Sequence, residues 1–108
     1  MVPVLVVEEL DELEQRGRDH ARDPARSVLR RLWELNSGGK QAADIPGARP
    51  VTVEVLADDS WHVRRPVNDN EIIERALFVS EITGGGVILA AGDYLMLYQA
   101  SSSGLKTA

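Results

Sequence analysis

The feature that most constrains this chain is a pair of short apolar runs with amphipathic segments between them. Residues 2–7 contain four valines and a leucine, and residues 87–91 read Val-Ile-Leu-Ala-Ala. Apolar residues that are continuous rather than alternating are typical of strands buried on both faces of a parallel sheet. The segments between the runs have the three- and four-residue spacing of helices. This order predicts an α/β fold with three layers, a largely parallel sheet and flanking helices.

Local signals place the remaining elements along the chain. A helix is predicted to follow the first run from Glu8, and a second to start with Asp23 as its N-cap and Pro24 as its first residue. Residues 40–50 are predicted to form a loop, 51–55 a strand, 68–80 a helix, 84–86 a turn and 94–100 a last helix. Residues 1–108 are predicted to form a single domain, in which the polar tail 101–108 frays.

Composition narrows the classes of function. The 108 residues include 12 Lys and Arg against 17 Asp and Glu, and the net charge of -5 argues against a general polyanion binder while allowing a local basic patch. The absence of cysteine excludes disulfides, thiolate zinc sites and cysteine nucleophiles. Two histidines are too few for a multi-histidine metal site, and 5% aromatic residues are few for a nucleobase-stacking platform. No apolar run approaches the roughly 18 residues of a membrane span, so a soluble cytoplasmic protein is predicted.

Three acidic residues stand where ligands of parallel sheets usually bind, beyond the carboxyl ends of strands. Glu9 lies two residues past the first apolar run, Asp93 lies two residues past the last, and Asp69 starts the helix between them. Carboxylates with few histidines and no cysteine suit a hard cation such as Mg²⁺ or Mn²⁺, which can assist phosphodiester hydrolysis. The same residues also suit helix caps and partners of the helix dipole, and spacing alone favours that interpretation.

At these acids the sequence resembles the PIN-domain ribonucleases, in three motifs that follow the family's order. Residues 4–13 resemble the family's second strand and next helix, in which a Glu stands directly before a Leu, as Glu9 does here. Residues 68–76 resemble its third acidic motif, in which Asp69 is followed by Ile three places on and by Ala seven places on. Residues 87–93 resemble the strand that ends in the fourth acidic position, which Asp93 fills.

The resemblance implies a PIN-like α/β domain that cleaves single-stranded RNA with Mg²⁺ or Mn²⁺. Glu9, Asp69 and Asp93 would be the catalytic carboxylates that hold the metal. Such an enzyme would be the toxin of a toxin–antitoxin pair or an RNA-processing nuclease. Its candidate protein partners are an antitoxin-like protein and, in a homo-oligomer, a second copy of the chain.

The sequence departs from the family pattern at two points. It is expected to begin at the family's second strand, without the first strand and the first Asp, and Ala91 replaces a Thr or Ser two places before the last acid. A site with one carboxylate fewer has less charge to hold Mg²⁺. The alternative prediction is therefore a non-catalytic PIN remnant that binds RNA or a protein partner, or a purely oligomerising module.

Arginines supply candidate contacts to RNA phosphates. Arg64 and Arg65 lie in a turn before Asp69, and Arg26 and Arg30 belong to a basic stripe on the helix that follows Asp23. A solvated helix face, whose arginines pair with nearby acids, is the alternative and is favoured for the stripe. An exposed turn is an equal alternative for Arg64 and Arg65.

The tryptophans and histidines carry weaker signals. Helical spacing predicts Trp33 in the core, and Trp61 is predicted to pack over an edge rather than to stack on a base. His20 and His62 have no partner at metal-ligand spacing, so we predict that both are surface or partly buried residues.

Overall fold

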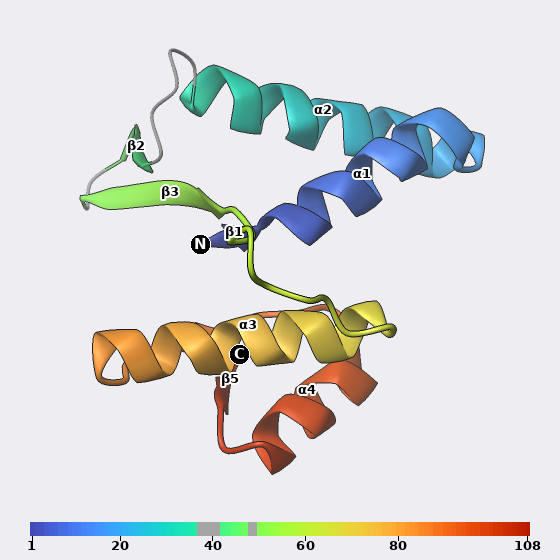
Figure 1. The fold of residues 1–108 in the computed structure, drawn as a ribbon. Coiled ribbons are helices and arrows are strands. Elements are labelled where there is room, and N and C mark those ends of the chain that lie inside the picture. Colours follow the sequence, from blue (N-terminus) through green and yellow to red (C-terminus); the bar gives the residue numbers. More distant parts are fainter. Residues whose placement is uncertain (37–41, 48–49) are drawn as a thin grey trace. The chain divides into compact units, whose positions relative to one another are not determined.

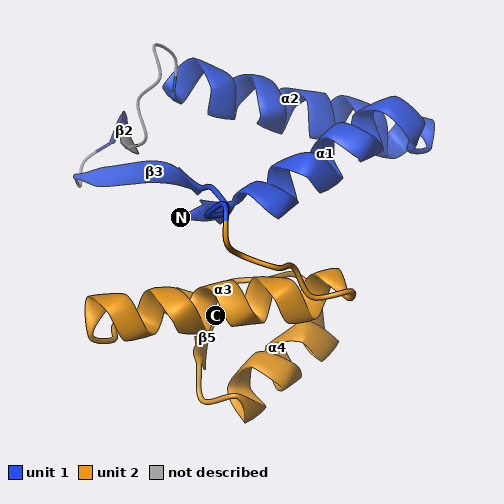
Figure 2. Ribbon diagram, in the orientation of Figure 1, with its two compact units in different colours: residues 1–60 blue, residues 61–108 orange. Residues whose placement is uncertain are grey.

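The structure, a computed structural model, describes residues 1–36, 42–47 and 50–108 and divides into two compact units. Residues 1–60 form unit 1 and residues 61–108 form unit 2 (Figure 2). Within the described ranges, no helix combines the length and the apolar character needed to cross a membrane.

Unit 1 combines two helices with a three-stranded sheet (Figure 1). Its elements are β1 (Val2–Pro3), α1 (Val4–Arg16), α2 (Asp19–Leu35), β2 (Ala42–Ile45) and β3 (Val51–Leu56). The central strand is β3, which pairs in parallel with β1, Val2 opposite Val55, and antiparallel with β2, Ala42 opposite Glu54. The predicted strand at residues 51–55 is confirmed. The predicted loop at residues 40–50 lies partly outside the described residues, and its residues 42–45 form a strand instead.

The predicted first strand is wrong over residues 4–7, which belong to a helix. Pro3 ends β1 with φ −60° and ψ 141°, and α1 begins at the next residue. Proline suits this place, because a helix needs no N–H from the residue at its start. Leu5 is the buried residue of α1, and strong helix formers continue the helix to Arg16. An apolar run this short fits a strand or a packed helical turn equally well, and the residues that follow decide the outcome.

Helix α2 packs against α1 (Figure 1). Arginines of α2 donate hydrogen bonds to the C-terminal part of α1. Arg22 donates from Nε to the backbone oxygen of Glu14 at 3.0 Å and from Nη2 to that of Gln15 at 3.2 Å. These carbonyls lie in the last turn of α1, where backbone oxygens lack partners within the helix. The second helix begins at Asp19, upstream of the predicted cap Asp23, so Pro24 lies inside it.

The predicted core position of Trp33 is wrong, because this side chain is 75% exposed on α2. The buried residue of α2 is Ala25, whose small side chain allows a close approach of neighbouring backbone. Helical spacing identifies an apolar stripe, but it does not say which part of that stripe meets a partner.

Unit 2 is built from two helices and a parallel strand pair. Its elements are α3 (Asn68–Thr83), β4 (Ile88–Leu89), α4 (Tyr94–Ser102) and β5 (Lys106–Thr107). The strands pair with Ile88 opposite Lys106, and α4 connects them. Buried apolar side chains come from α3, α4 and the residue before β5: Ile72, Ile73, Val79, Met96, Ala100 and Leu105. The helices predicted at residues 68–80 and 94–100 are confirmed.

The ends of the elements in unit 2 differ in detail from the prediction. Gly84, with φ +80°, ends α3 at the predicted turn, because a left-handed backbone favours glycine. The apolar run at residues 87–91 contributes only two residues to β4. The tail that was predicted to fray contains β5, and the Ala108 N–H donates to the Leu89 oxygen at 2.9 Å. Helices and strands together confirm the α/β class, while the three-layer, largely parallel sheet stays a prediction.

Candidate functional site

Asp93 is the N-cap of α4 and is exposed. Its Oδ1 accepts a hydrogen bond from the Leu95 N–H at 2.9 Å. This bond satisfies one of the amide groups that the first turn of a helix leaves without a partner. The capping interpretation of this acid is therefore correct in the structure. A cap uses one lone pair of one oxygen, so it leaves capacity on the carboxylate for a second ligand.

Asp69 lies in the first turn of α3 and is half-buried. Figure 1 shows the N-terminal ends of α3 and α4 at the same end of unit 2, and the two helices are in contact. Asp69 and Asp93 thus each sit at the positive end of a helix dipole. Helix N-termini are a common place for acidic side chains, because of this dipole.

Glu9 lies within α1 in unit 1 and is half-buried. The prediction that it stands just past the end of a strand is wrong, because residues 4–7 are helical. Its role as a metal ligand stays a prediction, and so do the roles of Asp69 and Asp93.

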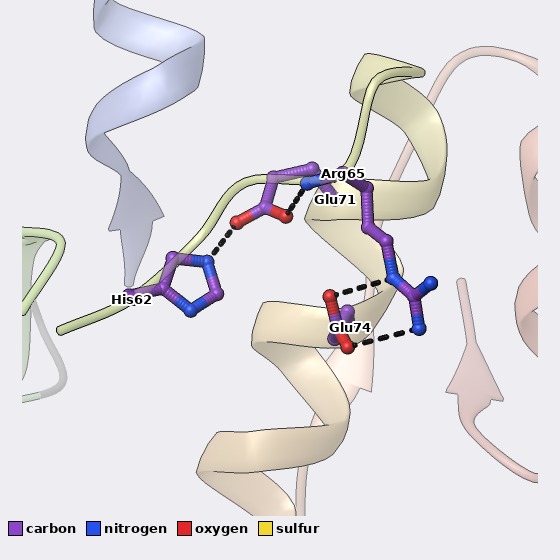
Figure 3. Close-up of polar contacts among 4 residues, drawn as sticks. All are labelled: His62, Arg65, Glu71 and Glu74. Atoms are coloured by element: carbon purple, nitrogen blue, oxygen red, sulfur yellow. Dashed lines mark hydrogen bonds and ion pairs between the residues drawn. The ribbon is translucent and has the colours of Figure 1, made fainter.

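Sequence reasoning missed a group of polar contacts around Glu71, a residue of α3 that is only 1% exposed (Figure 3). Glu71 Oε1 pairs with His62 Nε2, and Oε2 accepts from the Arg65 backbone N–H at 2.7 Å. The N-cap of α3 is Val67, and no side chain caps this helix.

The predicted RNA-contacting arginines of unit 2 lie just before α3. Arg65 is bidentate to Glu74, with Nε 3.0 Å from Oε2 and Nη2 3.2 Å from Oε1 (Figure 3). Its side chain is 60% exposed, so the pair lies in contact with solvent. Arg64 is exposed in the same segment. Trp61 is 68% exposed and meets the rings of His62 and Phe78 edge-on, while its packing over an edge stays a prediction.

The predicted arginines of unit 1 lie on α2. Arg26 Nε donates to Glu14 Oε1 at 2.9 Å, and this hydrogen bond, followed by the charge of Glu14, raises the pKa of the Arg26 guanidinium. Arg30 is exposed on the same helix. Other arginines of the stripe also face acids, with Arg31 3.9 Å from Glu34, as the solvated-face interpretation predicts.

The donor set of the three predicted ligands fits a hard divalent cation. Each would offer carboxylate oxygens, which Mg²⁺ and Mn²⁺ prefer, and two of the three, Asp69 and Asp93, stand at helix N-termini. A family model described as the PIN domain matches residues 1–108. The chain belongs to the PIN-domain family.

This assignment confirms the resemblance found in the acidic motifs. PIN domains are typically nucleases, bind RNA and generally use divalent metal ions. No curated protein and no solved structure matches the chain.

Proposed function

We propose that this PIN domain is a divalent-metal-dependent endoribonuclease that hydrolyses phosphodiester bonds in single-stranded RNA. The observation that carries the proposal is the family match over residues 1–108. The resemblance of the motifs at Glu9, Asp69 and Asp93 to the family's acidic motifs supports it. Because the match spans units 1 and 2, it also supports a single domain with a layered, largely parallel sheet.

Glu9, Asp69 and Asp93 would hold Mg²⁺ or Mn²⁺ through carboxylate oxygens. When bound, the ion supplies an activated water and neutralises charge on the phosphate. Asp93 is oriented by its bond from the Leu95 N–H, which restricts the rotation of its side chain.

The RNA backbone would contact Arg26, Arg30, Arg64 and Arg65. The guanidinium groups of Arg26 and Arg65 are each oriented by a glutamate, and their side chains are 52% and 60% exposed. Oriented and accessible cations can bind a phosphate with little loss of side-chain freedom. Two biological roles fit this activity. The protein would be a toxin that an antitoxin-like protein regulates, or an RNA-processing enzyme.

Cleavage of a fluorescent single-stranded RNA by the purified chain tests the proposal. We expect cleavage with Mn²⁺ or Mg²⁺ that EDTA abolishes and that Asp69→Asn and Asp93→Asn remove. Asp19→Asn is the matched control, because Asp19 also lies in the first turn of a helix but is outside the proposed site. This control should cleave like the wild type.

Two results would overturn the proposal. The first is an inactive wild type that shows no Mn²⁺ binding by calorimetry. The second is cleavage that both Asn variants retain. RNA binding without cleavage under all metal conditions would instead support the non-catalytic, RNA-binding alternative.

A further inference from the structure

Two residues of the segment before α3, His62 and Arg65, contact two glutamates of that helix. One carboxylate oxygen of Glu71 pairs with His62 Nε2. The other accepts a hydrogen bond from the Arg65 backbone N–H at 2.7 Å. One turn further along α3, the carboxylate of Glu74 accepts two hydrogen bonds from the Arg65 guanidinium (Figure 3). We call these four residues, His62, Arg65, Glu71 and Glu74, the α3 clasp.

The α3 clasp encloses the start of the helix, where Asp69 lies. The bond from the Arg65 N–H to Glu71 closes a ring of backbone and side chain that contains residues 66–70. Pro66 fixes one backbone angle within this ring. The Glu71 N–H also donates to the Val67 oxygen at 3.1 Å, which forms the first turn around Asp69. The backbone of Asp69 therefore has little freedom while both oxygens of Glu71 are engaged.

The clasp lies at a helix start that has no side-chain cap. Val67, at the N-cap position, offers no side-chain acceptor, so the first turn of α3 lacks the usual means of stabilisation. A buried carboxylate is costly unless its oxygens are satisfied, and an apolar residue would fill the same volume without that cost. At Glu71 both oxygens have donors, so the carboxylate provides directional contacts that an apolar side chain could not.

We propose that Glu71 is a positioning residue, which sets the place of Asp69 through the α3 clasp and does not itself bind the metal. This inference rests on the proposed function, in which Asp69 is a metal ligand. His62 and Arg65 act with Glu71 by presenting a ring nitrogen and a backbone amide to its two oxygens. The contribution of Glu74 is smaller, because its pair with Arg65 is exposed to solvent.

Three variants of the full chain test the positioning role. Glu71→Met replaces the carboxylate with an apolar side chain of similar length and removes both hydrogen bonds. Glu71→Gln keeps an oxygen for the Arg65 N–H and an amide that can donate to an unprotonated His62 Nε2. Glu81→Gln is the matched control, because Glu81 is an exposed glutamate of the same helix and lies outside both the clasp and the proposed site. If Glu71→Met does not fold, His62→Ala takes its place, because it removes one of the two bonds and leaves Glu71 present.

The first measurement is amide hydrogen exchange at residues 65 and 71 by NMR, without metal and well below the unfolding temperature. In Glu71→Met we expect both amides to exchange at least about tenfold faster than in the wild type. In Glu71→Gln we expect exchange within about threefold of the wild type. Unchanged exchange in Glu71→Met overturns the inference, whatever the enzymatic activity of the chain.

The second measurement separates positioning from general stability. In folded Glu71→Met, Mn²⁺ should bind at least about tenfold more weakly and kcat should fall, while KM for RNA stays near that of the wild type. Glu71→Gln should restore both values, and Glu81→Gln should leave them nearly unchanged. A Gln variant as defective as Met would show that the charge of Glu71 is required, and would overturn the positioning role. A wild type without Mn²⁺ binding or cleavage defeats the proposed function instead, and the exchange measurement then still decides whether the clasp orders this turn.

Discussion

Asp93 combines two roles that substitution can separate, because capping needs an oxygen acceptor and metal binding needs a charge. The Leu95 N–H lies 2.9 Å from Oδ1, so Asp93→Ala removes a satisfied N-cap. Such a loss costs about 1 kcal/mol of unfolding free energy. For a chain of 108 residues this corresponds to a decrease in Tm of roughly 4 °C. Because α4 contributes the buried side chains of Met96 and Ala100, we expect the loss to affect all of unit 2.

Asp93→Asn should behave differently, because its side-chain oxygen can still accept the Leu95 N–H. We expect its unfolding free energy to stay within about 0.5 kcal/mol of the wild type. Its Mn²⁺-dependent RNA cleavage should nevertheless fall roughly 100-fold or more, since an ionic ligand contributes several kcal/mol to a metal-assisted step.

Urea unfolding and RNA cleavage, measured on the same preparations of both variants, check these values. If Asn is as destabilising as Ala, the hydrogen bond from Leu95 does not account for the stability of α4. If Asn leaves cleavage intact, Asp93 is not a metal ligand. Each result refutes one role and leaves the other standing.

Two further predictions concern the packing of each unit. Arg22→Ala should lower the unfolding free energy by about 1 kcal/mol in urea titrations, because it removes the donors to two carbonyls at the end of α1. Arg30→Ala, at an exposed position of the same helix, should change the unfolding free energy by less than about 0.5 kcal/mol. Equal losses in the two variants would contradict a stabilising role for the hydrogen bonds from Arg22 to α1. Met96→Ala should cost about 2–3 kcal/mol in the same measurement, since this side chain is only 6% exposed. Its neighbour Leu95 is 61% exposed, so a comparable loss in Leu95→Ala would mean that the core of unit 2 is wrongly assigned.

Local signals sufficed to predict much of the secondary structure. The strand at residues 51–55 was predictable from its alternation, and the helix at 68–80 from its apolar spacing and the glycines after it. The helix at 94–100 was predictable from Gly92 and Asp93, which end the apolar run before it. Residues 4–7 could not be assigned in this way. Four apolar residues have no period of their own, and their helical state depends on the residues that follow them.

The candidate site was predictable only in part. The capping role of Asp93 follows from its place between an apolar run and a helical pattern, and the structure confirms it. The burial of Glu71 could not be inferred, because its partners are a histidine nine positions earlier and a backbone amide, which has no signature in the sequence. Charged residues are rarely buried, so composition favours an exposed glutamate until the donors are known.

The strand pairing of the two units has a consequence for the order of folding. In unit 2, β4 pairs with β5, with Ile88 opposite Lys106, and only α4 separates the two strands in the chain. This strand pair can therefore form as soon as α4 has formed. In unit 1, Val2 pairs with Val55, and β1 must wait until almost half of the chain has followed it. Contacts between distant positions carry a larger loop-closure entropy and form more slowly. During synthesis the first strand therefore leaves the ribosome well before its partner, and unit 1 acquires its parallel pair only after both of its helices are available to bring the ends together.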